Sequence, residues 1–588
     1  MLETHVLMQQ RFSDPKRNDF YERLFVYIVL AAMSLAFVAV IFKFGSRIPR
    51  KDDGRFIEYL ADGGQPTSQW LWEQVDVSRI PVSKFFMWLT FNVSEGDLRI
   101  QMLLGAIATI FGALVALKGL RDTFGRQSYT DAVVPFCLLH LGHVELLLWF
   151  MPVFHASLAN MFTTIIVTYC FCPLWKDSRK MTLLACVSLV MLPLQSISGL
   201  LLAIGLTIAC AILALSRTMR PNKDFDKFNT NLLLMSAGIC LGLIIVYFFN
   251  FDPLENQSQR GVNLQGAALS TLKIMAMSMG PVSNRVWPVS LIFVFFIFFT
   301  FFKYFFDFKK LNGKSQKMEC IAHCACTASL LILAFAIGWG RQWQTTIYDR
   351  YGYYMAPLVI VVYFAWSSRT RLSIFLRIIL FTSMSSSLLF HAQRGINKAQ
   401  DIKSATMSFE SDIQEKLPMT AIVGRHALFW SSDETSFERL LQSLKNANVL
   451  PFKYITPDPT FSHQPIAASN MTYHAFTRMD NDTLRSDSGD GWIKWNIDEK
   501  QTTLAVRLKY KLESPYNSTM MTFSTRSSKI HAGSSNSIRV NFNPNKPRKT
   551  ETLTIWINDS ISEFKLVPSN QPHLMSIYSL EQLTPDGD

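Results

Sequence analysis

Residues 101–120 read QMLLGAIATIFGALVALKGL, a stretch with one charged side chain, Lys118. A helix of about 20 mostly apolar residues is long enough to cross a bilayer. Similar stretches recur over the first two thirds of the chain. They predict about 11 transmembrane helices: 24–42, 101–120, 132–151, 158–174, 183–197, 200–215, 232–249, 286–306, 321–338, 355–366 and 372–390. Residues 183–215 could instead form one kinked hairpin, and 269–279 is short enough to be re-entrant or interfacial.

The composition also indicates a polytopic α-helical membrane protein. Of 588 residues, 49% are hydrophobic and only 17% are charged. The formal net charge of +13 would suit a nucleic-acid-binding protein, but the basic residues stand mainly at the ends of apolar stretches, as membrane orientation requires. We therefore expect membrane lipids, and no nucleic acid, as partners. All nine Cys lie between Cys137 and Cys326, so the C-terminal part has no disulfide framework.

The distribution of Lys and Arg predicts the orientation. Basic residues gather before the first apolar stretch and after every second one: Arg11, Lys16, Arg17, Arg23; Lys118, Arg121, Arg126; Lys176, Arg179, Lys180; Arg217, Arg220, Lys223, Lys227; Lys309, Lys310, Lys314, Lys317; Arg369 and Arg371. Such loops stay in the cytoplasm. Residues 1–23 are therefore predicted to be a cytoplasmic N-terminus followed by a retained anchor. The loop 45–98 and everything after residue 392 are predicted to be extracytoplasmic.

The composition changes after the predicted transmembrane domain, 24–392. Residues 393–460 have helical periodicity over 398–416 and 436–446, which predicts an extracytoplasmic helical linker. Residues 461–588 hold short segments of alternating apolar and polar residues, separated by Asn, Gly, Pro and Ser. This pattern predicts an antiparallel β-sandwich of jelly-roll type. The C-terminal region is therefore expected to be an α+β region outside the membrane.

The loop 45–98 holds the densest run of acidic and polar residues in the membrane half. Asp52, Asp53 and Asp76 are candidates for a catalytic base, because a base needs a carboxylate within reach of an acceptor hydroxyl. The alternative is that each is a solvated acid on an exposed loop.

Polar residues in and beside the predicted third helix form a second group. His140 and His143 are three residues apart and would share a helix face, while Glu145 points elsewhere. Titratable residues are costly inside a membrane and usually face a cavity or one another. Glu145 and His155 are expected near the outer surface, beside the loop 45–98. A polar seam between helices explains this group as well as a site does.

Arg341, Arg350 and Tyr351 belong to another predicted outer loop. Guanidinium groups bind phosphate through paired hydrogen bonds, so the two arginines could hold the phosphate of a lipid. Anchoring of the chain in the headgroup region by Arg and Tyr is the alternative.

The layout resembles the GT-C fold glycosyltransferases, which are polytopic proteins with a long acidic first outer loop. Several stretches are more closely similar to a group of bacterial membrane proteins related to that superfamily, whose first loop carries the motif LW-x-x-HNEHRIP. Residues 71–81, LWEQVDVSRIP, keep the Trp and the Arg-Ile-Pro. Val75, Val77 and Ser78 replace the glutamate and the histidines, so Asp76 is the carboxylate left in the motif.

Two further motifs carry the same resemblance. Glu145 with Trp149 is similar to the E-N-x-x-W pattern of the group, without its Asn. Gly340-Arg341 with residues 349–351, Asp-Arg-Tyr, is similar to its GR…SRY loop.

The resemblance implies an inverting GT-C type glycosyltransferase of the bacterial inner membrane, acting at the extracytoplasmic face. It would transfer a hexosyl or pentosyl group from a polyprenyl-phosphate-linked donor to a glycan or lipid acceptor of the cell envelope. Asp76, or Asp52 and Asp53, would serve as base; Arg341, Arg350 and Arg79 would hold the phosphate. No residue is assigned to a metal, and a divalent cation is the one cofactor left open. A glycolipid transporter and a non-catalytic subunit of a polysaccharide assembly complex are the alternatives.

Overall fold

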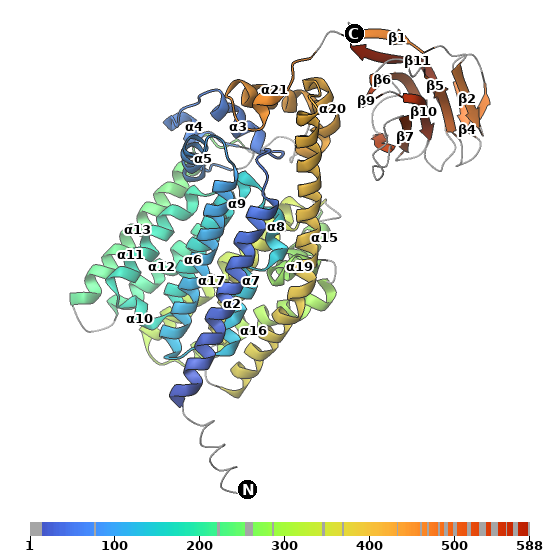
Figure 1. Ribbon diagram of the computed structural model, residues 1–588. Coiled ribbons are helices and arrows are strands. Elements are labelled where there is room, and N and C mark those ends of the chain that lie inside the picture. Colours follow the sequence, from blue (N-terminus) through green and yellow to red (C-terminus); the bar gives the residue numbers. More distant parts are fainter. Residues whose placement is uncertain are drawn as a thin grey trace. The chain divides into compact units, whose positions relative to one another are not determined.

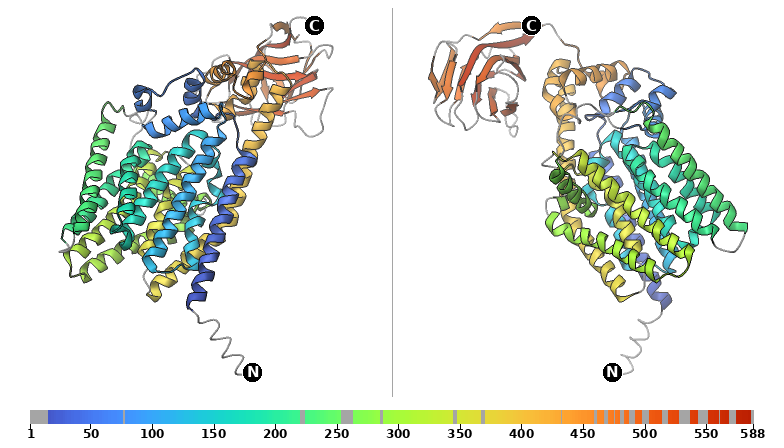
Figure 2. Two further views of the ribbon diagram at one scale, coloured as in Figure 1. Left: turned by 60° about the vertical axis from the view of Figure 1, so that its left-hand side comes forward. Right: turned by 180° about the vertical axis from the view of Figure 1, so that it is seen from behind.

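The computed structural model describes residues 15–75, 78–219, 224–252, 263–284, 287–343, 347–366, 370–431, 433–458, 461–466, 470–474, 476–479, 483–486, 492–497, 503–513, 519–527, 537–542, 551–559, 561–567 and 574–585. The chain divides into two compact units, Met1–Thr406 and Met407–Asp588. Figures 1 and 2 show a helical bundle in the first unit and strands in the second.

The first unit is a multi-pass membrane domain. Among the residues that the structure describes, eight helical segments are long and apolar enough to span a bilayer. They are α2 (Pro15–Phe44), α6 (Arg99–Phe124), the segment Tyr129–Leu147, α9 (Phe150–Phe171), α12 (Ile197–Thr218), α13 (Asp224–Phe248), α17 (Lys314–Gly340) and α19 (Arg371–Gln414). These confirm eight of the predicted stretches as helical, and the total of 11 stays a prediction.

The other predicted stretches are helical as well. Residues 183–197 and 355–366 correspond to α11 (Arg179–Met191) and α18 (Arg350–Ala365), of 13 and 16 residues, which are shorter than a full span. Residues 286–306 correspond to α16 (Trp287–Lys310). The short segment 269–279 lies in α15 (Leu264–Ala276) and the 3₁₀ turn η4 (Met277–Met279). The remaining short elements are α10 (Pro173–Lys176), η3 (Leu192–Leu194) and η5 (Pro281–Asn284).

Glycines of α6 let the bundle pack tightly at the stretch 101–120. Gly105 and Gly119 face α9, where an added Cβ on Gly105 would lie 2.8 Å from Val153 Cγ2 and one on Gly119 would collide with Thr168. Small residues at such positions let two membrane helices approach closely, because lipid provides little hydrophobic drive for their association. The glycines in the sequence of the second predicted span therefore favour the pairing of α6 with α9.

The third predicted span is broken, which corrects the expectation of one continuous helix. It consists of η1 (Tyr129–Ala132), α7 (Val133–Leu138), η2 (Leu141–His143) and α8 (Val144–Leu147). His140 has extended backbone angles between α7 and η2. Apolar periodicity alone predicted a single helix here, since Leu, Val and Phe dominate on both sides of the break.

The loop 45–98 is folded. It forms α3 (Asp53–Ala61), α4 (Ser68–Trp72) and α5 (Pro81–Val93), which lie at one end of the bundle, whereas α10 lies towards the other (Figure 1). Helix α3 buries Phe56, Ile57 and Leu60 together with Asp53. The predicted outer and inner loops thus lie at opposite ends of the bundle.

Helix α19 runs through the predicted boundary at residue 392 without a break and ends at Gln414. Gly395 lies inside it, where an added Cβ would collide with the carbonyl oxygen of Leu141. This glycine therefore serves close packing and does not end the helix.

The second unit begins with the end of α19 and two further helices, α20 (Met419–Trp430) and α21 (Glu434–Asn446), followed by η6 (Phe452–Tyr454). Asp412 at the end of α19 accepts hydrogen bonds from Arg425 Nη1 and His426 Nε2 of α20, each 2.9 Å long. The predicted helix 436–446 is confirmed as α21, whose apolar face, Phe437, Leu440, Leu441 and Leu444, is buried.

The strands form two antiparallel sheets. Their bounds are β1 (Phe461–Pro465), β2 (Met471–His474), β3 (Phe476–Arg478), β4 (Thr483–Ser486), β5 (Trp492–Asn496), β6 (Thr503–Glu513), β7 (Thr519–Ser527), β8 (Ser537–Phe542), β9 (Glu551–Asp559), β10 (Ile561–Val567) and β11 (Leu574–Pro585). One sheet has the order β3-β4-β11-β6-β9, with β1 also paired to β11; the other has β2-β5-β10-β7-β8. Apolar residues of both sheets, such as Trp495, Leu508 and Phe564, share one core, which confirms the antiparallel sandwich.

Candidate functional site

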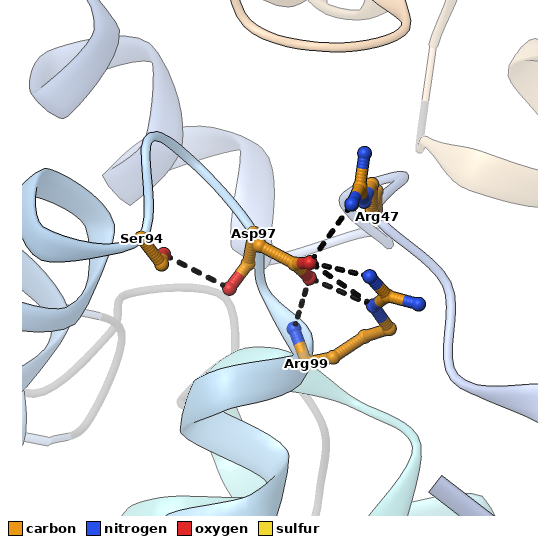
Figure 3. A network of polar contacts seen from close by, with 4 residues as sticks. All are labelled: Arg47, Ser94, Asp97 and Arg99. Carbon is orange, nitrogen blue, oxygen red and sulfur yellow. Dashed lines mark hydrogen bonds and ion pairs between the residues drawn. The ribbon is translucent and has the colours of Figure 1, made fainter. Parts of the chain in front are cut away.

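Both ends of the loop 45–98 are held by one carboxylate, that of Asp97 (Figure 3). Arg47, just after α2, contacts Asp97 Oδ2 at 3.1 Å, and Arg99, the first residue of α6, binds both oxygens of Asp97 through Nε at 2.9 and 3.2 Å. Burial alone would raise the pKa of Asp97, but its hydrogen bonds to Arg99 and the charges of both arginines bring this pKa below its usual range. An anionic Asp97 therefore closes the base of the loop.

Asp53 joins the loop to the start of α9. Its Oδ2 accepts a hydrogen bond from the backbone N–H of Arg50, and its Oδ1 accepts one from that of Met151, each 2.9 Å long. The residue is only 1% exposed, and burial raises its pKa to about 7 even though the two backbone hydrogen bonds and Arg50 act against the shift. Asp53 is therefore an anchor with little access to solvent.

Asp52 is the more accessible of the two predicted acids. It is partly exposed and precedes α3, and its side chain makes no capping hydrogen bond to that helix. Its charge acts on the guanidinium of Arg350.

Trp149, which lies between α8 and α9, is flanked by two arginines from distant parts of the chain. The guanidinium carbons of Arg50 and Arg350 lie 5.4 and 4.8 Å from its ring centroid. The indole Nε1 donates to the carbonyl of Arg50 at 3.2 Å. Arg50 is 6% exposed, and its Nε and Nη1 have no hydrogen-bond partner among the residues that the structure describes. We call Arg50, Asp52, Asp53, Trp149 and Arg350 the Trp149 cluster.

Arg341 and Tyr351 lie at the edge of this cluster. The guanidinium carbons of Arg341 and Arg350 are 5.2 and 5.5 Å from the ring centroid of Tyr351. Glu145 is partly exposed, and its charge acts on Arg50 and on Asp349. The structure therefore brings together Asp52, Asp53, Glu145, Arg341, Arg350 and Tyr351 of the residues singled out from the sequence.

The segment that carries Arg350 is fixed by an ion pair that sequence reasoning missed. Asp349 accepts hydrogen bonds from Arg394 of α19 through both of its oxygens. Burial raises the pKa of Asp349, and the charge of Arg394 opposes this shift. No sequence motif predicts this ion pair, because its two residues are 45 positions apart in the chain.

Three histidine rings lie close together inside the first unit. The rings of His140 and His143 have centroids 3.8 Å apart, and His391 of α19 lies 4.9 Å from His140. The sequence suggested that His140 and His143 share a helix face, but their proximity arises at the break between α7 and η2. His143 Nε2 donates to the carbonyl of Cys137, whereas both ring nitrogens of His140 have no partner.

His155 lies elsewhere, in α9, where its Nε2 is 3.1 Å from the hydroxyl of Tyr354. Among the residues that the structure describes, no group of three or more His, Cys, Asp or Glu side chains is arranged to hold a metal ion.

Arg79 is not placed with the other arginines. Its Nη1 donates to the carbonyl of Trp72 at 2.6 Å, and its Nη2 donates to those of Phe249 and Asn250 at 3.0 and 2.9 Å. The residue is 6% exposed and ties the loop to the end of α13. These contacts indicate a structural role and leave no Nη atom of Arg79 unpaired for a phosphate. Asp76, the remaining predicted base, lies outside the described residues.

Sequence reasoning missed Arg50, Arg394 and His391. The run Arg50-Lys51-Asp52-Asp53 after the first apolar stretch could have indicated Arg50, because opposite charges gather there. The roles of Arg394 and His391 depend on tertiary contacts that no local pattern encodes.

A scan of protein-family models and a search of curated proteins found no match to this chain. Among solved structures, the chain is similar to a cryo-EM structure of a mutant of the arabinofuranosyltransferase AftD from mycobacteria, with a TM-score of 0.30 and 10% identity. The similarity covers 95% of this chain and 63% of that enzyme, so this chain spans less than two thirds of the enzyme's length. A likeness at this TM-score assigns neither the fold nor the activity.

Proposed function

We propose that this multi-pass membrane protein is an inverting GT-C type glycosyltransferase of the bacterial inner membrane. In this proposal it transfers a sugar from a polyprenyl-phosphate donor to a glycan or lipid acceptor at the extracytoplasmic face. The observation that carries the proposal is the Trp149 cluster, in which Arg50 and Arg350 flank Trp149 and a partly exposed carboxylate, Asp52, acts through its charge on Arg350. A base and a phosphate-binding group are the two parts that such a transfer requires.

The reaction uses these residues in distinct roles. The oxygen of the acceptor hydroxyl attacks the anomeric carbon of the donor sugar, and its proton passes to the carboxylate of Asp52. The bond between that carbon and the phosphate oxygen breaks, and the electron pair stays on the polyprenyl phosphate. Arg350, with Arg341 beside it, stabilises the charge of the departing phosphate. Arg50, whose Nε and Nη1 are unpaired, contributes a fixed positive charge next to them.

Asp53 positions Asp52 and takes no proton in this mechanism. Both of its oxygens are engaged by backbone N–H groups, which fixes the first turn of α3 against α9. The loss of Asp53 would therefore displace its neighbour without removing the base.

The second unit is proposed to contact the acceptor glycan. Its strands β4 to β11 are divided between the two sheets in the orders β4-β11-β6-β9 and β5-β10-β7-β8. This is the strand order expected for an eight-stranded jelly roll, a fold that also occurs in lectin domains.

Reconstitution with a polyprenyl-phosphate sugar donor in liposomes tests the proposal. Asp52→Asn should lower the rate of transfer by at least about 100-fold, the scale of a lost general base, without reducing the amount of folded protein. Asp62→Asn is the matched control, because Asp62 is an exposed acid at the other end of α3. Unchanged transfer in the Asp52→Asn variant would exclude the base assignment, and the absence of transfer by the wild type with both hexosyl and pentosyl donors would exclude the function.

A transporter of envelope glycolipids is the second candidate, and one observation favours it. The helix break at 139–143 leaves buried polar groups in the bundle, among them the two unpaired nitrogens of His140. Interrupted helices of this kind line substrate paths in transporters. Movement of labelled glycolipid across liposomes without any sugar transfer would support this candidate over the glycosyltransferase.

A further inference from the structure

A cavity lies in the loop 45–98, and none of the residues of the Trp149 cluster lines it. It has a volume of about 620 Å³, and three aromatic residues line it: Tyr59 of α3 and Trp70 and Trp72 of α4. Gln69 and Glu73 add an amide and a carboxylate to the same wall, and both are exposed. Pockets that combine aromatic walls with a few polar groups are typical of small-molecule sites.

The aromatic rings form a layered wall. The rings of Tyr59 and Trp70 are stacked, with centroids 4.8 Å apart and an angle of 13° between their planes. Trp70 is 7% exposed, whereas Tyr59 and Trp72 are partly exposed. Trp70 therefore supports Tyr59, and ring surface of Tyr59 and Trp72 remains open to a ligand.

The main chain of this wall is held by two buried cations. Lys84 of α5 is 0% exposed, and its ammonium donates to the carbonyls of Trp70 and Glu73 at 2.5 and 3.0 Å. Arg79 donates to the carbonyl of Trp72 at 2.6 Å. Because their carbonyls are fixed in this way, the wall residues need little reordering when a ligand binds, which favours affinity.

The polar groups of the cavity indicate the class of ligand. Among the lining residues, the one cation is Arg79, and both of its Nη atoms already donate to carbonyls. The Nε of Arg79 has no hydrogen-bond partner among the described residues but is buried. A phosphate in the cavity would therefore meet no accessible N–H group of Arg79 and would be repelled by Glu73. A sugar ring offers C–H faces that pack on aromatic rings and hydroxyls that pair with an amide and a carboxylate. The cavity suits a neutral saccharide.

Helix α3 connects this cavity to the Trp149 cluster. Asp52 precedes the first turn of α3 and Tyr59 lies seven residues later, so the two are separated by about 10 Å along the helix axis. We propose that the cavity is a saccharide subsite that holds a sugar unit of the glycan whose neighbouring unit reacts at Asp52. This assignment of a role in transfer rests on the proposed function, whereas saccharide binding itself does not.

The source of the sugar is either a glycan acceptor or the sugar of the lipid-linked donor. Binding of soluble tetrasaccharides of hexopyranose or pentofuranose units to the full chain in nanodiscs reports on the acceptor. Binding of the polyprenyl-phosphate sugar in the same nanodiscs reports on the donor.

Titration of these probes against three variants tests the subsite. Trp72→Ala and Glu73→Gln should each weaken saccharide binding by about 10-fold or more, the scale of a lost stacking or charged hydrogen-bonding contact. Trp88→Ala is the matched control, because Trp88 is a partly exposed residue of α5 outside the cavity, and it should leave binding unchanged. A thermal unfolding curve for each variant establishes that the loop remains folded.

The outcomes separate the subsite from the catalytic proposal. If the wild type binds neither probe at millimolar concentration, or if Trp72→Ala and Glu73→Gln bind as the wild type does, the subsite is refuted, even when transfer is observed. If the wild type binds saccharide through Trp72 but transfers no sugar, the subsite stands and the proposed function fails. If Asp52→Asn still binds saccharide but no longer transfers sugar, the result would support both the subsite and the proposed function.

Discussion

Asp349 and Arg394 form a bidentate ion pair, with both hydrogen bonds 2.6 Å long. Asp349 immediately precedes α18, and Arg394 belongs to α19. The pair therefore fixes the end of the helix from which Arg350 reaches Trp149. Its geometry depends on a planar guanidinium, which lysine cannot reproduce.

Arg394→Lys should consequently lower the free energy of unfolding by about 1–3 kcal/mol, the scale of a lost hydrogen bond between charged groups. Thermal or denaturant unfolding in nanodiscs measures the change. Lys118→Gln is a suitable control, since it removes an exposed ion pair on α6 and should cost under about 1 kcal/mol. An equal effect of the two substitutions would contradict the role assigned to Arg394.

Asp97→Asn should loosen the whole loop 45–98, because the substitution removes the negative charge that Arg47 and Arg99 share. The folded-state pKa of Asp97 is depressed, so its stabilisation is present above the unfolded carboxyl pKa of about 4 and is lost as pH falls through the folded value. Hydrogen exchange of residues 45–98, corrected for intrinsic rates, should be faster in the variant at pH 7. The difference in exchange rate between variant and wild type should shrink at strongly acidic pH. A difference that grows there would refute the role assigned to the Asp97 carboxylate.

Lys84 should give a second rise of stability with pH, in the alkaline range. Burial lowers its pKa to about 8, from about 10.4 in the unfolded chain, although Glu73 opposes the shift. The charged ammonium is thus disfavoured in the folded state, and the free energy of unfolding should rise as pH increases from about 8 to about 10.4. Lys84→Met should abolish this rise, which pH-dependent unfolding can measure. Lys43→Met, at an exposed position on α2, should preserve it.

Trp149→Phe tests the Trp149 cluster in the proposed reaction. The substitution removes the hydrogen bond to the carbonyl of Arg50 and weakens the contact of the ring with both guanidinium groups. A loss of about 1–2 kcal/mol of cation–π interaction corresponds to roughly a 5- to 30-fold lower kcat/KM for the lipid-linked donor. The control is Trp88→Phe, which should leave kcat/KM unchanged. Equal kcat/KM values for Trp149→Phe and the wild type would show that Trp149 does not contribute to the donor site.

The elements that follow from length and apolar content were predictable from the sequence. The helices α6 and α17 lie where apolar runs indicated, and strands β5 to β9 lie where alternating patterns indicated. The helix break at His140 was not predictable, because the residues around it are as apolar as those of an unbroken span. The continuity of α19 was also missed, because the change of composition at Gln393 was interpreted as a boundary, whereas the helix continues through it to Gln414.

The candidate site was predictable in part. Asp52, Asp53 and Arg350 are charged residues in predicted outer loops, so charge and predicted orientation indicated them. Arg79 belongs to the same kinds of loop but is buried and bound to three carbonyls, a difference that only the tertiary structure reveals. Lys84 gave no signal at all, because a lone lysine in an apolar stretch is usually exposed.

The length of α19 limits how the protein can be divided. Its 44 residues correspond to about 66 Å, twice what a bilayer core of about 30 Å requires. A soluble fragment beginning at residue 393 would start in mid-helix, and a cut between Thr406 and Met407 would also sever it. A cut after Gln414 spares the helix but separates Asp412 from Arg425 and His426. A cut that spares both α19 and these hydrogen bonds therefore has to lie beyond α20, which ends at Trp430.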